Sequence, residues 1–190
     1  MGHRRTSREL AMQALFYMET CRYGGEEKMA LFLKSRSIAR QVRPFFLDLV
    51  AAVEGNKDRI DAIIKRFSSN WKISRMSGVD RNVLRVAVYE MLGCDDIPVK
   101  VSINEAIDIG KKFGTEASGA FINGILDSVR MAISDGDIQV EFIPPDVARK
   151  AFTLPEPDDL ADAPPEPDPV SFTRVRGKNG IVKRRSTEDG

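Results

Sequence analysis

The sequence is poor in the side chains on which most catalytic and metal sites depend. Its 190 residues include one histidine, His3, and two cysteines, Cys21 and Cys94. Two isolated thiols do not form a disulfide framework, and no cysteine and histidine have the spacing of zinc ligands. The glycine-rich phosphate-binding patterns GxxxxGK[ST] and GxGxxG are absent. We therefore expect no cofactor, no metal and no enzymatic activity.

Long hydrophobic runs and a large net charge are also missing. No apolar stretch approaches the roughly 20 residues that span a bilayer. The apolar part of residues 1–18 is interrupted by Glu9 and Gln13, unlike a signal peptide. These features predict a cytoplasmic protein without membrane contact. The formal net charge is only +1, so affinity for nucleic acid would require local clusters of basic residues.

The composition of the chain changes near residue 136. Helical spacing of apolar residues dominates before this point, whereas most of the prolines follow it. Residues 146–168 are mainly acidic, and residues 174–185 are mainly basic. We therefore predict one domain over 1–135 and a disordered tail over 136–190, Pro-rich and acidic and then basic. The basic end is a candidate for additional phosphate contacts.

Helical periodicity predicts an all-α domain. Thr6 and Glu9 have capping-box spacing, which predicts that the first helix opens at Thr6, and Gly24-Gly25 is expected to end it. We expect a short helix over 26–34 and one continuous helix over 44–67. A further helix should start at Ser77 or Asp80. A second capping box at Ser102 and Glu105 predicts a helix that ends at Gly114, and a last helix is expected over 121–133. Helical spacing continues through Asn123-Gly124, which argues against a hairpin there.

Three arginines, Arg4, Arg5 and Arg8, lie near the start of the first predicted helix. Arginine side chains suit phosphate oxygens and can stack on bases. Cations at a helix N-terminus oppose the helix dipole, and a bound anion would offset that cost. From these residues alone, a phosphate-binding surface and a solvated terminus remain equally open.

Four segments have a recognisable order and spacing. They are RRTSRELAMQAL at 4–15, RNVLRVAVYE at 81–90, PVKVSINEAIDIGKKF at 98–113 and FINGILD at 121–127. Together they resemble the NusB family of bacterial transcription antitermination factors over residues 4 to about 130. Each segment alone is weak, and the four jointly are specific.

The resemblance implies a compact all-α domain of two small antiparallel helical bundles. It implies binding of single-stranded boxA RNA together with NusE, a small-subunit ribosomal protein. The pair would join elongating RNA polymerase with other Nus factors and help it resist termination, notably in ribosomal RNA operons. A homodimer remains open.

The resemblance also assigns residues to two surfaces. The RNA-binding residues it implies are Arg4, Arg5, Arg8, Lys100, Lys111 and Phe121. The NusE-binding residues it implies are Phe16, Asp80, Tyr89 and Glu90. For Phe121, core packing and base stacking both remain open.

Other residues receive structural interpretations. The only tryptophan, Trp71, is interpreted as a core or bundle-junction residue. Arg85 and Asp127 are a candidate internal ion pair, and Gly124 is expected to allow close approach of two helices.

Two alternative functions remain open. One is a stand-alone NusB-like protein in ribosomal RNA maturation or ribosome assembly, and the other is a protein–protein scaffold without RNA. An accessory domain of a ribosomal RNA methyltransferase would need a second α/β domain, for which the tail composition offers no pattern.

Overall fold

The computed structural model describes residues 2–21, 27–68, 71–151, 154–155 and 158. Within these ranges every regular element is helical, which confirms the all-α prediction. The elements are α1 (His3–Thr20), α2 (Glu27–Lys34), α3 (Arg43–Gly55), α4 (Lys57–Phe67), the short 3-10 helix η1 (Ile73–Arg75), α5 (Gly78–Gly93), α6 (Val99–Phe113), α7 (Ser118–Ser134) and α8 (Pro145–Ala151).

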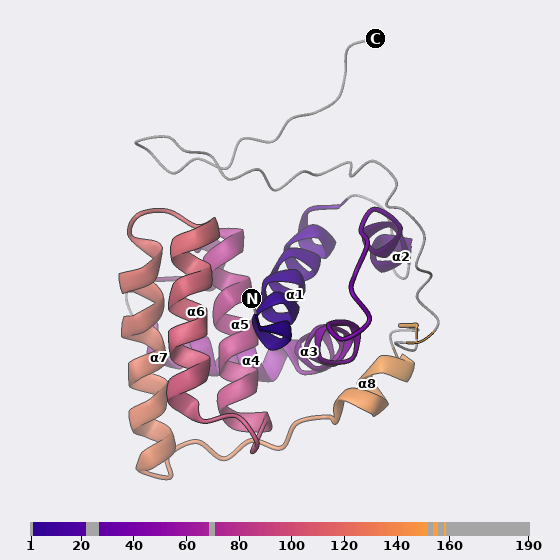
Figure 1. Cartoon of the computed structure of the whole chain (residues 1–190). Helices are drawn as coiled ribbons and strands as arrows, with labels where there is room; N and C mark the ends of the chain where they lie inside the picture. Colours follow the sequence, from indigo (N-terminus) through magenta and orange to yellow (C-terminus); the bar gives the residue numbers. More distant parts are fainter. Residues whose placement is uncertain (1, 22–26, 69–70, 152–153, 156–157, 159–190) are drawn as a thin grey trace.

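Helix α5 lies at the centre of the molecule. It packs against α1 and α3 and also against α4, α6 and α7. Figure 1 shows α1–α3 on one side of α5 and the antiparallel pair α6 and α7 on the other. Two small helical groups therefore share one core, as the resemblance implied.

The start of α5 shows why this helix forms where it does. The hydroxyl Oγ of Ser77 accepts a hydrogen bond from the backbone N–H of Asp80 at 3.0 Å. This satisfies one of the free N–H groups at the helix N-terminus. Of the two predicted starts, Ser77 is confirmed. The apolar residues that follow, such as Leu84 and Val88, are fully buried.

The predicted start of α1 is wrong. The helix begins at His3, one turn before Thr6, so Glu9 lies inside it. The Glu9 carboxylate does not cap the helix but accepts a hydrogen bond of 2.5 Å from Lys112 Nζ on α6. Capping-box spacing can also occur within a helix, where contacts from another helix decide what the side chains bind.

The predicted start of α6 at Ser102 is also wrong. The helix begins directly after Pro98, so Ser102 lies within it and is only 1% exposed. Proline at the beginning of a helix is favourable because its missing N–H would have no partner there. The predicted end at Gly114 is confirmed.

The segment between α1 and α2 is only partly described. Cys21 caps the C-terminus of α1 through its backbone N–H. The predicted stop at Gly24-Gly25 lies outside the described residues. Helix α2 begins one residue later than predicted and buries Met29 and Phe32.

The single rod predicted over 44–67 is wrong, because Asn56 separates α3 from α4. The Asn56 side chain donates to Ala52 O at 2.9 Å and to Ile143 O at 3.0 Å. Its Oδ1 accepts the Ile143 N–H at 2.8 Å. Because α3 and α4 face the same core, their apolar residues keep the same helical spacing on both sides of Asn56. The sequence pattern therefore did not reveal the break between the two helices.

Helix α7 continues through Asn123-Gly124, as predicted. Gly124, however, does not permit a close helix approach, because a Cβ there would meet no atom within 4 Å. Gly110 on α6 has that role instead, since a Cβ there would collide with the Ile122 side chain on α7.

The chain after α7 packs on the helical core for as far as it is continuously described. Residues 145–151, expected to be extended and poorly packed, form α8 against α3, with Ala148 1% exposed. The ring of Phe142 lies 5.4 Å from that of Tyr89, and Arg149 pairs with Asp48. Figure 1 shows this segment running from α7 past α3. The C-terminal strap is defined here as residues 137–151. The division of the chain into a domain and a tail stays a prediction.

Candidate functional site

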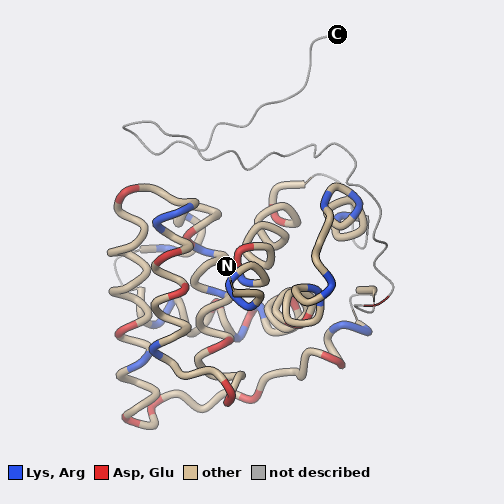
Figure 2. Tube along the Cα trace, in the orientation of Figure 1, with Lys and Arg blue, Asp and Glu red and all other residues tan. Residues whose placement is uncertain are grey.

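The start of α1 carries two cationic side chains on its exposed face. Arg4 Nη2 lies 2.7 Å from Asp96 Oδ2, and the Arg4 side chain is 55% exposed. Arg5 Nη2 donates to Asp108 Oδ2 at 2.6 Å, and this hydrogen bond raises the pKa of Arg5. Figure 2 shows the basic start of α1 beside α6, which carries charges of both signs.

Arg8, one turn further along α1, has a different environment. It is 4% exposed, and its Nε donates to Glu90 Oε1 on α5 at 2.6 Å. Glu90 is itself 1% exposed. The Arg8 guanidinium also lies over the Phe45 ring at 5.5 Å. The structure therefore presents Arg4 and Arg5 at the surface and holds Arg8 inside.

The remaining predicted RNA-binding residues lie along α6 and α7. Lys100 is exposed in the first turn of α6, and Lys111 is exposed near its end. The stem of Lys111 crosses α7 at Gly119, where a Cβ would lie 2.9 Å from Lys111 Cγ. Phe121, two residues further on, is partly buried against the core. Helix α6 thus lies between the start of α1, which carries the arginines, and α7, which carries Phe121.

Trp71 is not a core residue, which corrects the first of its two interpretations. It is 55% exposed and precedes η1. Its ring centroid lies 5.9 Å from that of Phe121, with the two planes at 74°. Sequence reasoning missed Trp71 as a surface residue because tryptophan is usually highly buried.

Phe16 and Asp80, two of the residues predicted to bind the partner, lie at one site. The Phe16 ring packs on the start of α5, where a Cβ on Gly78 would be 2.5 Å from Phe16 Cε2. Asp80 lies in the first turn of that helix and is 8% exposed. Its buried Oδ1 makes no hydrogen bond within the described part of the chain. An aromatic ring and an acidic group therefore meet where α1 crosses the start of α5.

Tyr89 and Glu90, which were also predicted to bind the partner, are buried. Tyr89 is 3% exposed beneath Phe142 of the C-terminal strap, and burial raises its pKa above the ordinary range. Glu90 is buried against Arg8. Both lie about ten residues after Asp80, which places them in the second half of α5.

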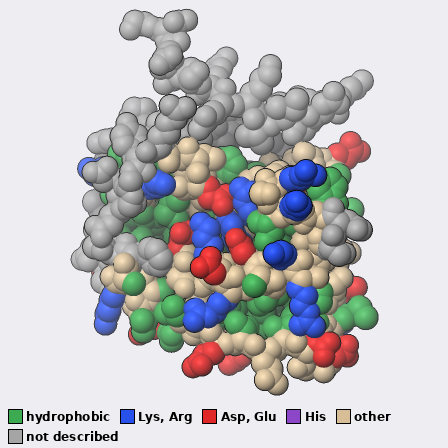
Figure 3. All heavy atoms as spheres, turned by 180° about the vertical axis from the view of Figure 1, so that it is seen from behind, with side chains coloured by type: hydrophobic (Ala, Val, Ile, Leu, Met, Phe, Trp, Pro, Cys, Tyr) green, Lys and Arg blue, Asp and Glu red, His purple; other side chains and the backbone are tan. Residues whose placement is uncertain are grey.

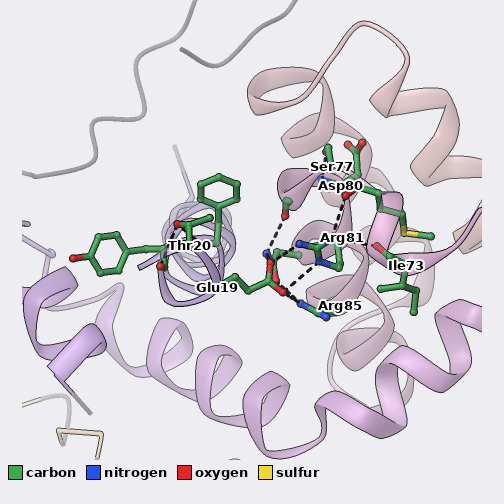
Figure 4. A network of polar contacts seen from close by, with 12 residues as sticks. Glu19, Thr20, Ile73, Ser77, Asp80, Arg81 and Arg85 are labelled. Carbon is green, nitrogen blue, oxygen red and sulfur yellow. Dashed lines mark hydrogen bonds and ion pairs between the residues drawn. The ribbon is translucent and has the colours of Figure 1, made fainter. Parts of the chain in front are cut away.

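A partly buried ion network lies close to the Phe16–Asp80 site. Figure 4 shows Glu19 of α1 directed at Arg81 and Arg85 of α5. Arg81 Nη2 donates to Glu19 Oε2 at 2.8 Å, and Arg85 also pairs with Glu19. Burial tends to raise the pKa of Glu19, but the hydrogen bonds from both arginines outweigh this and lower it to about 2.

The predicted pairing of Arg85 with Asp127 is wrong. Arg85 binds Asp61 on α4 through two hydrogen bonds of 2.7 Å. Asp127 pairs with Arg130 on its own helix at 2.8 Å. No sequence spacing indicates the true partners, because they come from three different helices.

The opposite face of the molecule carries charges of both signs. Figure 3 shows acidic and basic side chains interspersed with hydrophobic ones on the face opposite that of Figure 1. The described residues contain no group of three or more His, Cys, Asp or Glu side chains placed to hold a metal ion. None of the helices in the described ranges is long and apolar enough to cross a membrane.

Comparisons with known proteins agree with this arrangement. The chain is 53% identical over 133 residues to the transcription antitermination protein NusB of Desulforapulum autotrophicum, covering 69% of this chain and 93% of that protein. It is 44% identical over 138 residues to the protein of the same name from Myxococcus xanthus, covering 70% and 99%.

Solved structures show the same fold. T. maritima NusB superposes with a TM-score of 0.61 at 36% identity, covering 71% of this chain and 97% of that one. NusB in a crystal structure of the antitermination factors NusB and NusE with double-stranded RNA gives 0.62 at 25% identity, covering 70% and 98%. The model of the NusB family matches residues 5–131, which hold every residue of both surfaces except Arg4. The chain belongs to the NusB family.

Proposed function

We propose that this chain is a transcription antitermination factor that binds boxA-type single-stranded RNA together with NusE. The complex joins elongating RNA polymerase with other Nus factors and helps it resist termination, notably in ribosomal RNA operons. The relatives named transcription antitermination protein NusB and the NusB–NusE–RNA structure support this assignment. The observation that carries it is the presentation of Arg4 and Arg5 at the surface, beside α6.

Arg4 is held by one exposed ion pair, whereas Arg5 is 34% exposed and lies 3.9 Å from Glu9 and 3.8 Å from Glu105 as well as beside Asp108. The Arg4 and Asp96 side chains are 55% and 64% exposed. Exposed ion pairs contribute only about 0–1 kcal/mol, so a phosphate can replace the aspartate at little cost. The proposed RNA surface comprises Arg4, Arg5, Lys100, Lys111 and Phe121. Arg8 is a positioning residue, because leaving its buried pair with Glu90 would uncover two desolvated charges.

We assign NusE binding to the surface formed by Phe16, Gly78 and Asp80. The Phe16 ring, packed on Gly78, provides apolar contact area, and Asp80 places an acidic group in the first turn of α5. We leave Tyr89 and Glu90 out of the proposed surface because they are 3% and 1% exposed.

The proposal includes the absence of an enzymatic activity and a cytoplasmic location. An adaptor acts by holding RNA and protein together, so it needs no catalytic group. Transcription and the ribosomal protein NusE are both cytoplasmic in bacteria, which is why we place the chain there.

Measurements of RNA binding test the proposal directly. Fluorescence anisotropy of a labelled boxA-type RNA is followed with this protein alone, with NusE added, and with a scrambled RNA. We expect NusE to increase both affinity and selectivity. Selective RNA binding that NusE does not change would favour a stand-alone role in ribosome assembly. NusE binding without RNA binding would favour a protein scaffold.

The double variant Arg4→Ala/Arg5→Ala tests the RNA surface. If both side chains contact phosphates, the salt slope of log K should decrease by roughly 1.4, about 0.7 for each contact with a single strand. Lys34→Ala, an exposed cation on α2, is the matched control and should leave the slope unchanged. Equal salt slopes for Arg4→Ala/Arg5→Ala and Lys34→Ala would contradict phosphate contacts by Arg4 and Arg5.

A further inference from the structure

The backbone of Trp71 is tied to a buried residue, Ser68. The Trp71 N–H donates to Ser68 O at 2.8 Å, and Ser68 Oγ donates to Trp71 O at 3.1 Å. Ser68 is only 6% exposed, whereas Trp71 is 55% exposed. The indole therefore lies at the surface on a backbone that these two hydrogen bonds restrain, which lowers the entropy cost of binding a flat ligand.

Phe121 supports the Trp71 ring from the side. The centroids are 5.9 Å apart and the planes are at 74°, an edge arrangement. Because the planes are so steeply inclined, one flat base cannot stack on both rings. Phe121 is the more buried of the two and packs against the core. Trp71 therefore offers the free aromatic face, and Phe121 fixes its orientation.

Cationic side chains lie on the elements that carry these rings. Lys72 and Arg75 follow Trp71 in the chain and are exposed. Lys111 is exposed, and its stem rests on Gly119, two residues before Phe121. Glu116, in the loop between α6 and α7, is an exposed acid on these elements. Aromatic faces combined with cations suit single-stranded nucleic acid, because each nucleotide has a flat base and a negative phosphate.

We propose that Trp71 stacks with an unpaired base of single-stranded RNA, with Phe121 holding the indole and Lys111 near the adjoining phosphate. This inference rests on the proposed RNA-binding function and extends it to a residue outside the predicted RNA surface. It also assigns Phe121 a supporting role in place of direct stacking. Stacking uses the face that every base has, so the contact adds affinity with little sequence preference.

Trp71 is the only tryptophan, so its fluorescence reports on this site alone. The full-length protein is titrated with boxA-type RNA while Trp71 emission and the anisotropy of a labelled RNA are recorded. Stacking should quench the emission in parallel with binding. RNA binding without quenching would overturn the inference and leave the proposed function intact. Absence of any anisotropy change, both with this protein alone and with NusE added, would overturn both.

Substitutions give a second, independent test. Trp71→Ala should weaken RNA binding by about tenfold with an unchanged salt slope, while Trp71→Phe should retain most of the affinity. Met131→Ala on α7 is the matched control, because Met131 is also 55% exposed, and it should have no effect. Wild-type affinity in Trp71→Ala, with a native circular dichroism spectrum, would contradict the proposal.

Abasic substitution of the RNA identifies the stacked base. Each base is removed in turn, and one position should lose affinity with the wild-type protein but not with Trp71→Ala. That non-additivity would show a direct contact between the base and the indole. Fully additive losses at every position would reject stacking at Trp71.

Discussion

At the scale of single residues, Arg5 and Arg8 show how one turn of helix separates two roles. Arg5 points to the exposed side of α1 and pairs with Asp108, whose side chain is 49% exposed. Arg8 is directed into the junction with α5 and pairs with Glu90, whose side chain is 1% exposed. A phosphate can replace Asp108 as the partner of Arg5, whereas the pair of Arg8 and Glu90 holds α1 and α5 together.

Arg8→Ala should therefore mainly lower the stability of the fold and have a smaller effect on RNA binding. Removing one partner of a buried ion pair leaves the other charge unpaired, which costs about 3–5 kcal/mol. Arg4→Ala, at an exposed pair, should cost less than about 1 kcal/mol. Urea denaturation followed by circular dichroism measures both values. Similar losses of unfolding free energy in Arg8→Ala and Arg4→Ala would contradict the view that the buried pair of Arg8 stabilises the fold more than the exposed pair of Arg4.

Asp108→Asn should strengthen RNA binding by a few-fold. The substitution removes the carboxylate that holds Arg5 and that repels phosphate. Asp127→Asn is the control, because Asp127 is also half exposed and pairs with an arginine, on α7. Weaker RNA binding in Asp108→Asn would instead mean that Asp108 orients Arg5 for its contact.

At the scale of helices, the Glu19 network joins α1, α4 and α5. Arg85 pairs with Glu19 on α1 and with Asp61 on α4. Arg81 pairs with Glu19 and also donates to Ile73 O at 3.2 Å in η1. The network thereby fixes the start of α5, where the proposed NusE surface lies.

Glu19 should make stability depend on pH in the acid range. Its pKa is lowered from 4.5 to about 2 in the folded chain. The stabilisation is therefore complete above about pH 4.5 and is lost as the pH falls towards 2. Glu19→Gln should lower the free energy of unfolding at neutral pH by roughly 3 kcal/mol and flatten this pH dependence.

Denaturation series between pH 2 and 7 measure this effect. Glu116→Gln, in the exposed loop between α6 and α7, is the control and should follow the wild-type curve. A Glu19→Gln variant with the wild-type pH profile would show that other carboxylates govern acid unfolding.

Helix positions were largely predictable, whereas some helix boundaries were not. The apolar spacing of α5 and α7 follows one face of each helix, and both were predicted. The break at Asn56 was not predicted, because its cause is a contact with Ile143, 87 residues away. Local patterns do not contain such a partner.

At the scale of the whole molecule, the C-terminal strap extends the NusB fold. The family match ends at residue 131, and the strap continues along α3. It covers Tyr89 with Phe142 and satisfies the Asn56 side chain with Ile143. The strap therefore links the helix break, the second half of α5 and α3.

Ending the chain after Gly136 should destabilise the helical domain by about 2 kcal/mol or more, through lost burial and unsatisfied Asn56 groups. It should also lower the pKa of Tyr89 towards its ordinary value of 10.0, because the phenol becomes exposed. Thermal unfolding and ultraviolet titration of tyrosine measure the two effects. An unchanged tyrosine titration would mean that the strap does not cover Tyr89.

A chain ending after Asp158 is the control, because it keeps the strap and should keep the stability. The same truncation tests the basic end of the predicted tail. If residues 174–185 contact phosphates, the salt slope of RNA binding should decrease in this chain. An identical slope would assign RNA binding to the helical domain alone.

By itself, the sequence determined the all-α class, the four ordered segments of the NusB family and the basic start of α1. These features depend on the identity and spacing of residues that are close together in the sequence. Only the tertiary structure decided that Arg8 is internal, that Trp71 is exposed and that Tyr89 is covered. Burial and pairing depend on which helices meet: the fold brings Glu90 to Arg8, Phe121 to Trp71 and Phe142 to Tyr89.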